Sequence, residues 1–594
     1  MGSLRSQDMS VKTALSQSDG PTEIPLLKKT IGQEFATIVE RFPNRAAIKS
    51  ANKEISYVEL NEMSDILAIA LLNLEVRPGD RVAVSLGNCI EYAVIVYACF
   101  KIGAILVPLN PAYTPLQTIS ALNHISARCF IISAEITLPY KDPQSTKELL
   151  NKIICPDPNV SAKVSSLRDI ILIDNSSGRV DITSMPVTAD YYALLLAYRG
   201  QRFLIQHQLH ADDVINIQFT SGTTSAPKAA CLTHRNILNN GFLVGEAMTH
   251  GAALLLPSES FNARAALKSI ADHRATVLYG VPTMFIAELD LLSENLLPAS
   301  AIRKLRTGVI GGSSIPPALR IQLHDKMNLS GLTNCYGLTE ASPIACMTRI
   351  DDPLESKLET VGKVLPHTSI RITARDDPNQ ILPRGEKGEI QIGGYSVMKG
   401  YWRAEAETKK VLVKEDHFSV QNKHRASSSS ASYPRFWLRS GDEGLIDQDG
   451  NIKITGRIKD IIIRGGENIY PAEIENCLLK HDLIGNASVV GLPDARYGEV
   501  VAAFIVPQEG VTPIVEDQDQ TGDLRLAKDA IDGHHTNSNL VLINAEIVRL
   551  WIRQHLSKML APKYVFWVSQ LPLTASGKVE KYKLREMGEQ WMRQ

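Results

Sequence analysis

The sequence has no uninterrupted apolar run of membrane-spanning length, no excess of positive charge and no closely spaced pair of cysteines. Its 594 residues include 63 Lys and Arg against 64 Asp and Glu, which leaves a net charge of -1. Proteins that bind nucleic acid usually carry a basic excess, and a helix that spans a membrane needs about 20 apolar residues in a row. We therefore expect neither a nucleic-acid partner nor a membrane span.

The eight cysteines are spread along the chain, and no two of them form a C-x-x-C pair. This distribution disfavours a zinc site and favours a reducing compartment over secretion. Residues 1–20 lack the apolar core of a signal peptide, and residues 591–594 do not match the peroxisomal Ser-Lys-Leu signal. We expect a cytoplasmic or peroxisomal protein without a secretion signal.

What is present is the composition of a globular protein, with 44% hydrophobic and 21% charged residues. Ile31, Phe35 and Ile38 recur at helical spacing, and short apolar runs then alternate with helical patterns. Continuous apolar strands separated by helices are typical of a parallel sheet that is buried on both faces. The predicted fold class is therefore α/β, with strands at 81–86, 104–108, 129–132, 170–174 and 214–217.

The pattern changes after about residue 365. Residues 369–372 and 389–392 alternate apolar and polar side chains, as half-exposed antiparallel strands do. Asp449 and Gly450 separate two further apolar runs, which predicts a hairpin. From about residue 458 an α+β region follows, and its clearest helix begins after Asn544 as N-cap. One face of that helix is predicted to carry Val548, Ile552, Leu556 and Met559.

These changes divide the chain into three parts. A disordered tail is expected at 1–25, and a large N-terminal domain at 26–456 is expected to combine parallel α/β sheets with a small β-barrel-like part. A small mobile α+β C-terminal domain is expected at 457–594. Residues 421–434 and 515–539 are poor in apolar side chains, so we interpret them as inserted loops without a chemical role.

The most specific polar stretch, residues 219–228, reads FTSGTTSAPK and directly follows a predicted strand. Hydroxyl groups, backbone N–H groups and a lysine just past a strand can bind phosphate. Because Gly222 stands alone, the stretch is not the G-x-x-x-x-G-K-[ST] phosphate loop. Taken by itself, a polar surface loop is the alternative interpretation.

Three further stretches carry side chains suited to a nucleotide, although each by itself could be an ordinary surface segment. Tyr336 and Glu340 could stack on a purine and bind a divalent metal ion. Asp442 could accept hydrogen bonds from both ribose hydroxyls, and Arg457 could pair with a phosphate. The last stretch, residues 573–578, ends at Lys578 in a loop near the C-terminus.

Together these stretches resemble the motifs of the acyl-CoA synthetases in the adenylate-forming superfamily. They occur in that family's order, over about residues 30–585, as TSGTTSAPK, YGLTE, SGD, GRIKDIIIRGGENIYPAEIE and PLTASGK. GVPTMFIAEL and RGGENIYPAEIE are most similar to medium-chain acyl-CoA ligases, and fungal ligases that activate acids such as mevalonate for siderophores are similar too. The resemblance implies a ligase that joins an acid to coenzyme A through acyl-AMP, in fatty acid metabolism or siderophore biosynthesis.

The resemblance also assigns roles to individual residues, with ATP, Mg²⁺ and coenzyme A as cofactors. Lys578, Thr224 and Glu340 would be catalytic, and Glu340 would hold the Mg²⁺. Lys459 would lie at a hinge about which the C-terminal domain rotates. Ser314 would line the adenine and acyl edge beside the cofactor-binding residues, which are expected to be Thr220, Ser221, Gly222, Thr223, Thr224, Ser225, Ala226, Pro227, Lys228, Gly312, Ser313, Tyr336, Thr339, Asp442, Arg457, Gly465, Gly466 and Glu467.

The sequence departs from the family pattern in three ways. Ser225 and Ala229 stand where the family usually has glycine, and Ser440 replaces a threonine. The largest departure follows Met248, where the family has on the order of thirty more residues that form part of the sheet and one wall of the acyl pocket. We therefore expect the chain to bind ATP weakly and to adenylate acids poorly.

Three functions are compatible with these features. The first is an ATP-dependent acyl-CoA ligase, which Lys578, Glu340, Asp442 and Arg457 favour. The second is an impaired homologue, a truncated splice or gene-model form that binds nucleotide only, which the shortened segment after Met248 favours. The third is an acyl-AMP ligase that loads a carrier protein. The expected partners are a small carboxylic acid and a carrier protein or an acyltransferase of the same pathway.

Overall fold

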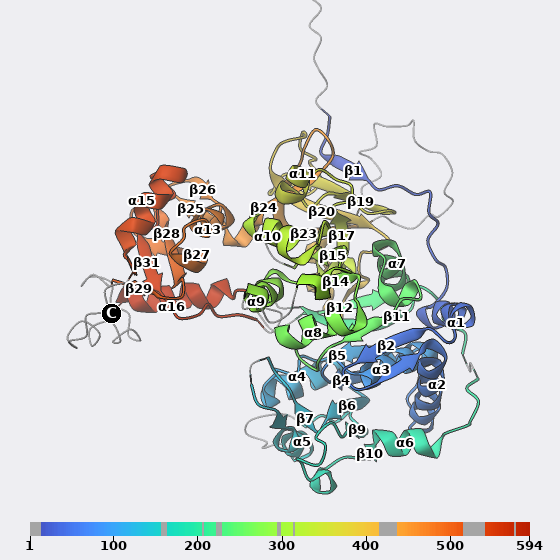
Figure 1. Ribbon diagram of the computed structural model, residues 1–594. Coiled ribbons are helices and arrows are strands. Elements are labelled where there is room, and N and C mark those ends of the chain that lie inside the picture. The colour runs from blue at the N-terminus through green and yellow to red at the C-terminus, as the bar shows by residue number, and fades with distance from the viewer. Residues whose placement is uncertain are drawn as a thin grey trace, which may run out of the picture.

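A computed structural model of the chain describes residues 14–139, 141–155, 163–204, 207–220, 228–293, 299–312, 315, 317–414, 436–514, 541–574 and 578–593. Its larger part contains three main sheets, and a smaller C-terminal part lies to one side (Figure 1). No helix in these ranges is both long and apolar enough to cross a membrane.

The first sheet has eight strands in the order β10-β9-β6-β4-β5-β11-β12-β21. It is parallel from β10 to β11 and antiparallel beyond, and it contains every strand predicted between residues 81 and 217. The bounds are β4 (Arg81–Ser85), β5 (Ile105–Pro108), β6 (Cys129–Ser133), β9 (Asp169–Ile173), β10 (Ala189–Asp190), β11 (Val214–Thr220), β12 (Lys228–Thr233) and β21 (Gly400–Tyr401).

Helices cover both faces of this sheet, as its continuous apolar strands require. Val82 and Val84 of β4 pack with α1 (Ile31–Arg41), α2 (Tyr57–Asn73) and α3 (Ile90–Ile102). Ala83, between them, points to the other face and packs with α4 (Pro115–Ile125) and α5 (Lys147–Ile154). The helix predicted from Ile31 onward is α1, which Thr30 caps through a hydrogen bond from the backbone N–H of Gln33.

A second sheet, with the order β14-β15-β16-β17-β18, carries part of the site residues. Its strands are β14 (Val277–Gly280), β15 (Thr307–Ile310), β16 (Gly331–Gly337), β17 (Ile344–Met347) and β18 (Lys363–Val364). The first three are parallel, and α8 (Ala263–His273), α9 (Pro282–Ser293) and α10 (Pro317–Met327) pack against them.

The third sheet is antiparallel, as the alternating pattern predicted. Its path is β1-β19-β20-β23-β22, with β24 beside β23, and the described strands do not close into a barrel. The part that the sequence indicated to be barrel-like is therefore an open sheet. The bounds are β1 (Gln17–Asp19), β19 (Thr368–Thr373), β20 (Gly388–Gly394), β22 (Leu412–Lys414), β23 (Phe436–Ile446) and β24 (Ile452–Arg457).

The expectation of a disordered tail up to residue 25 is wrong for its second half. Residues 17–19 form β1, an edge strand paired with β19, and Ser16 is fully buried with its hydroxyl donating to the carbonyl of Pro383 at 2.8 Å. Composition missed this strand because its stabilisation comes from backbone hydrogen bonds at a sheet edge rather than from apolar side chains.

The C-terminal part is a sheet flanked by helices. Its strands are β25 (Ile462–Arg464), β26 (Glu467–Ile469), β27 (Ile484–Asp494), β28 (Gly498–Pro507) and β31 (Tyr564–Trp567), and its helices are α13 (Pro471–Leu478), α15 (Ala545–His555) and α16 (Lys581–Arg593). Asn544 caps α15 by accepting from the N–H of Ile547 at 2.9 Å, as predicted. The helix ends before Met559, which is exposed, so that residue does not extend the apolar face. The predicted loops at 421–434 and 515–539 lie outside the described residues.

The remaining elements are short connections and edge pieces. They are β2 (Ala46–Ser50), β3 (Glu54–Ser56), β7 (Glu135–Ile136), β8 (Gln144–Ser145), α6 (Tyr191–Ala197), α7 (His234–Val244), β13 (Leu254–Leu256), α11 (Leu354–Glu359), α12 (Glu405–Val411), β29 (Val511–Pro513) and β30 (Val541–Ile543).

The shortened connection after α7 is held by its own hydrogen bonds, but it leaves β14 at the edge of the second sheet. Glu246 accepts hydrogen bonds from the N–H groups of Met248 and Thr249, and β13 then joins β2 in a small separate sheet. Beyond it, β14 has only β15 as a partner among the described strands. Val277 and Tyr279 of β14 are 37% and 46% exposed, which is unusual for apolar side chains in a parallel sheet.

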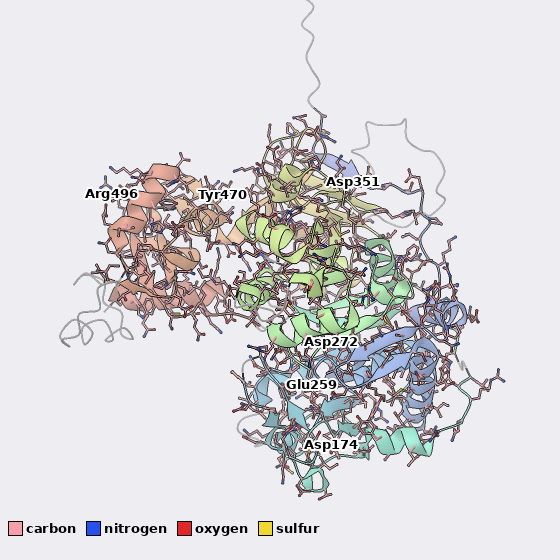
Figure 2. The ribbon with its side chains drawn as sticks, in the orientation of Figure 1. Asp174, Glu259, Asp272, Asp351, Tyr470 and Arg496 are labelled. Atoms are coloured by element: carbon pink, nitrogen blue, oxygen red, sulfur yellow. The ribbon has the colours of Figure 1, made fainter. Side chains whose placement is uncertain are left out.

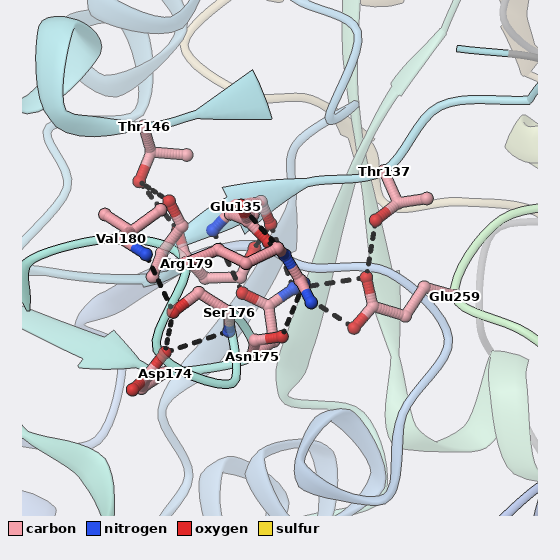
Figure 3. A network of polar contacts seen from close by, with 11 residues as sticks. Glu135, Thr137, Thr146, Asp174, Asn175, Ser176, Arg179, Val180 and Glu259 are labelled. Atoms are coloured by element: carbon pink, nitrogen blue, oxygen red, sulfur yellow. Dashed lines mark hydrogen bonds and ion pairs between the residues drawn. The ribbon is translucent and has the colours of Figure 1, made fainter. Parts of the chain in front are cut away.

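A polar network anchors the loop that follows β13 to the first sheet (Figure 3). The carboxylate of Glu259 accepts hydrogen bonds from Thr137 at 2.8 Å and from the amide of Asn175 at 3.1 Å. Asn175 also donates to the backbone of Glu135, whose carboxylate pairs with Arg179 at 2.6 Å. This network fixes the route of the chain from β13 to α8 and hence the position of the second sheet.

If the exposed edge at β14 reflects a missing segment, supplying that segment should increase both stability and activity. We expect insertion of a family-like segment between Met248 and Thr249 to raise the unfolding temperature and the rate of ATP–pyrophosphate exchange, because it would cover β14. A Gly-Ser insertion of equal length at the same point is the control. Equal exchange rates for the original and restored chains would show that the short connection is tolerated.

His234 should make the stability of the first sheet acid-sensitive. It is fully buried, its Nδ1 accepts from the N–H of Ile31 at 3.2 Å, and burial lowers its pKa to about 4. The unfolded chain binds a proton at a histidine pKa of about 6.5, so stability is lost as pH falls from there toward the folded value. Between pH 7 and pH 5 this residue should cost about 2 kcal/mol. Denaturant unfolding of the wild type and His234→Gln at both pH values tests this, and parallel pH dependences would contradict it.

Candidate active site

One cavity of about 2600 Å³ lies between the second sheet, the third sheet and the C-terminal part. Its wall brings together residues that are more than 350 positions apart in the sequence. The predicted site residues that line it are Thr220, Lys228, Gly312, Tyr336, Thr339, Glu340, Asp442, Arg457, Lys459 and Lys578. Residues 221–227, Ser313 and Ser314 lie outside the described residues.

Asp442 is the best-defined anchor of this cavity. Register pairs it with Arg457 across β23 and β24, and its Oδ1 lies 3.2 Å from the Nε of Arg457. The hydroxyl of Tyr336, at the end of β16, donates to its Oδ2 at 2.8 Å. Burial raises the pKa of Asp442, while Arg457 and the Tyr336 hydrogen bond oppose that rise. The carboxylate thus joins the second and third sheets.

The turn before Asp442 explains why serine is accepted at position 440. The Ser440 hydroxyl donates to the carbonyl of Ile390 at 2.7 Å and accepts from the N–H of Asp442 at 3.0 Å. Threonine offers the same hydroxyl, so the replacement keeps both contacts. Gly441 has a left-handed backbone with φ of +73°, which favours glycine at this position.

Glu340 is held in place by Tyr401, a residue that the sequence did not indicate. The hydroxyl of Tyr401 donates to Glu340 Oε1 at 2.8 Å, and Lys228 lies 5.1 Å from the centre of the Tyr401 ring. Lys228 also pairs with Glu407 of α12 at 3.1 Å. A tyrosine on a two-residue strand, 61 positions from its carboxylate partner, leaves no signal in a single sequence.

Thr220 and Lys228 lie opposite each other because β11 and β12 form an antiparallel pair. The stretch that the sequence indicated for phosphate therefore connects two neighbouring strands whose ends open into the cavity. Ala229, which stands where the family usually has glycine, lies in β12 with 1% exposure and packs in the apolar core. Its Cβ fills space between strands and helices rather than the cavity.

Lys578 reaches the cavity from the C-terminal part. Thr574 holds it, since the N–H of Thr574 donates to the carbonyl of Lys578 at 2.7 Å and the N–H of Lys578 donates to the Thr574 hydroxyl. Burial within the cavity and the charge of Arg457 lower the pKa of Lys578, and Asp442 and Glu340 raise it. Lys578 thus lines the same cavity as both carboxylates.

The predicted hinge residue lines the cavity, whereas the predicted glycine pair does not. Lys459 lies in the short helical turn at Ile458–Asp460, directly after Arg457, and lines the cavity. Gly465, Gly466 and Glu467 form the tip of the β25–β26 hairpin and do not line it. In this orientation of the C-terminal part, Lys578 and not the glycine pair faces the cavity.

Tyr470, also missed from the sequence, is a contact between the two parts. It precedes α13 on the side of the C-terminal part that faces the third sheet, while Arg496 lies on the far side (Figure 2). Burial and, after it, a hydrogen bond to the buried Glu443 raise the pKa of Tyr470, and Lys387 lies 4.1 Å from the centre of its ring. These contacts hold the C-terminal part in the orientation that presents Lys578.

Four cationic side chains converge on the cavity. They come from β12, the end of β24, the hinge turn and the C-terminal loop, and they are Lys228, Arg457, Lys459 and Lys578. Burial lowers the pKa of Lys459, and the positive charges of Arg457 and Lys228 lower it further. Two of them have carboxylate partners, Lys228 with Glu407 and Arg457 with Asp442. Four cations that line one cavity suit a polyphosphate. Asp442 nearby suits a ribose.

The family comparison covers most of the chain. The model described as AMP-binding enzyme matches residues 35–247 and 246–402, and the model described as AMP-binding enzyme C-terminal domain matches residues 473–578. The two stretches of the first match meet at residues 246–247, beside the point where the sequence analysis places a missing segment.

Several curated relatives are similar over nearly their whole length. Acyl-CoA ligase SID4 of Ajellomyces capsulatus is 34% identical, over 96% of this chain and 93% of its own. Acyl-CoA ligase sidI of Aspergillus fumigatus is 33% identical over the same shares. The mitochondrial medium-chain acyl-CoA ligase ACSF2 of Mus musculus is 32% identical, over 98% of this chain and 91% of its own.

Solved structures show the same fold. ATP-bound MatB from Rhodopseudomonas palustris superposes with a TM-score of 0.71 at 24% identity, covering 93% of this chain and 98% of that one. The o-succinylbenzoate CoA synthetase MenE of Bacillus subtilis, in complex with its acyl-adenylate intermediate, gives a TM-score of 0.67 at 22% identity, covering 94% and 99%.

Proposed function

This chain belongs to the AMP-binding enzyme family, and from that premise we propose that it converts a small or medium-length carboxylic acid into its coenzyme A thioester. At the coarser level, it is an ATP-dependent acyl-CoA ligase, an acid–thiol ligase like the relatives it matches. The proposal concerns the acid, the roles of the individual residues and the acceptor.

The convergence of Lys228, Arg457, Lys459 and Lys578 on one cavity carries the residue assignment. ATP brings a triphosphate, and its charge would offset the mutual repulsion of these side chains. Asp442 would accept hydrogen bonds from the ribose hydroxyls, and Tyr336, whose hydroxyl already contacts Asp442, would lie against the adenine. Thr220 and residues 221–227, Thr224 among them, would bind the outer phosphates.

The first half-reaction would join the acid to AMP. A carboxylate oxygen of the acid attacks the α-phosphorus, the bond from that phosphorus to the bridging oxygen breaks, and pyrophosphate leaves. Negative charge grows on the α-phosphate oxygens, and Lys578 is positioned to stabilise it, with Thr339 on the same wall. Because no group on the protein forms a covalent bond, catalysis rests on positioning and charge.

The second half-reaction would transfer the acyl group to coenzyme A. The thiolate sulfur attacks the acyl carbon, the bond from that carbon to the phosphate oxygen breaks, and AMP leaves. We propose that rotation about Lys459 removes Lys578 from the cavity and brings Gly465, Gly466 and Glu467 toward coenzyme A. The distance of this hairpin tip from the cavity in the present orientation supports such a rotation.

The Mg²⁺ expected with ATP fits one carboxylate of this site. Mg²⁺ usually takes one or two carboxylates together with substrate phosphates and water. Glu340 lines the cavity, Tyr401 donates a hydrogen bond to its Oε1, and no described residue donates one to its Oε2. We propose Glu340 as the ligand, and the ion would neutralise charge on the phosphates when bound.

Two classes of acid are supported by the relatives. The name of the mouse relative supports a medium-chain fatty acid, and the similarity to the sidI ligases supports a short branched or hydroxy acid such as mevalonate in siderophore biosynthesis. Coenzyme A is the proposed acceptor, because the relatives are named acyl-CoA ligases. A cytoplasmic or peroxisomal location stays a prediction.

Lys578→Ala should separate the two half-reactions. We expect ATP–pyrophosphate exchange to fall about 100- to 1,000-fold, which is the usual cost of removing one group that stabilises transition-state charge. Thioester formation from supplied acyl-AMP should stay within a few-fold of the wild type, because Lys578 acts only in the first step. Lys563→Ala, which removes a surface lysine paired with Asp494, is the matched control. An equal loss in both steps would contradict this role.

Lys459→Pro should have the opposite effect. Proline fixes φ near -65° and would restrict rotation at the hinge. Adenylation should survive, and transfer from acyl-AMP to coenzyme A should fall at least about tenfold, which corresponds to about 1.4 kcal/mol on the barrier. Lys459→Ala removes the side chain without the ring and separates a backbone effect from a charge effect. Normal transfer by the proline variant would place the hinge elsewhere.

A further inference from the structure

A buried arginine without a partner lies in the wall of the same cavity. Arg320 on α10 is only 6% exposed, and its Nε makes no hydrogen bond. None of the ion pairs among the described residues involves it. Burying an unpaired guanidinium is costly, and native proteins usually pair such a group or bind a ligand with it.

The electrostatics of Arg320 agree with this geometry. Burial lowers its pKa to about 10, and no other cause contributes. Arg320 therefore has no ion-pair partner among the described residues.

The position of Arg320 relates it to the acid rather than to the ribose. Its helix begins five residues after Gly312, which lies just past β15 and was expected at the adenine and acyl edge. The same cavity is lined by apolar side chains, among them Ile286, Ile315 and Leu319, and by Asp290 and Gln322. The cations assigned to ATP come instead from β12, β24, the turn at Ile458–Asp460 and the C-terminal loop. A cation among several apolar and a few polar side chains is a typical specificity element of a ligand pocket.

We propose that Arg320 binds an oxyanion carried by a substrate, and that this oxyanion is a second carboxylate at the far end of the acid. A guanidinium and a carboxylate can form two parallel hydrogen bonds, so the pair would fix the length as well as the charge of the acid. The substrate class would then be dicarboxylic acids that are activated at one end. This deepens the proposed function and rests on it. A phosphate of coenzyme A offers similar chemistry, and the experiment separates the two.

The test is ATP–pyrophosphate exchange without coenzyme A, using dicarboxylic acids and monocarboxylic acids of matched length. The wild type should prefer one dicarboxylic acid. Arg320→Leu should lose at least about 100-fold in kcat/KM for that acid, because a site built to bind a polar group strongly discriminates against its loss. Its activity on the matched monocarboxylic acid should stay equal or rise. Arg320→Lys should show an intermediate loss of kcat/KM, since lysine keeps the charge but cannot form the two parallel hydrogen bonds of a guanidinium. Arg303→Leu, an exposed arginine outside the cavity wall, is the control.

A second arm supplies preformed acyl-AMP and varies coenzyme A. A rise in KM for coenzyme A in Arg320→Leu, abolished with dephospho-coenzyme A, would assign the oxyanion to coenzyme A and overturn the assignment to the acid. Unchanged kinetics in both arms would overturn the whole proposal.

A binding measurement separates this proposal from the ligase function. At least one dicarboxylic acid of the panel should raise the unfolding temperature of the ATP-bound wild type, and Arg320→Leu should lose that shift. If no acid supports exchange but the Arg320-dependent shift is present, the ligase proposal fails and the Arg320 proposal stands. Equal shifts for wild type and variant would refute the role of Arg320.

Discussion

The buried carboxylate of Asp442 is the interaction on which the site depends. One oxygen pairs with Arg457 across two strands, and the other accepts the hydroxyl of Tyr336 from another sheet. A carboxylate in this position is stable only while both partners remain, because an unpaired buried charge costs several kcal/mol. Asp442 therefore fixes the relative position of two sheets. It also fixes where the proposed hinge would begin, since Lys459 follows Arg457 by two residues.

The C-terminal part then completes the site from outside. Tyr470 contacts the third sheet through Glu443 and Lys387, and Lys578 enters the cavity from a loop more than 100 residues later. The interface near Tyr470 is polar, which is typical of parts that move relative to one another. An enzyme that needs one lysine in one step and a different surface in the next requires such an interface. A large apolar contact would hold a single orientation.

Most of the fold could be predicted from the sequence, because the strands of the first sheet are continuous apolar runs and those of the third sheet alternate. The exceptions have physical reasons. β1 carries polar side chains and is stabilised mainly by backbone pairing rather than by apolar contacts, and the α15 helix ends before Met559 despite matching spacing. The site residues with linear motifs, such as Asp442 and Lys578, were found, and the structure brings them to one cavity. Tyr401, Tyr470 and Arg320 could not be predicted in this way, because their roles depend on which side chains, distant in the sequence, they contact or do not contact.

The open edge at β14 also bears on how the protein behaves at high concentration. Its exposed side chains are a valine and a tyrosine, and the strand V-L-Y-G contains none of the lysines or prolines with which natural proteins usually protect a free edge. A net charge of -1 gives little long-range repulsion between copies. Colloidal behaviour should therefore depend on this one strand more than on the overall surface. In a cell, newly made chains would offer chaperones and neighbouring chains the same short template for β-pairing.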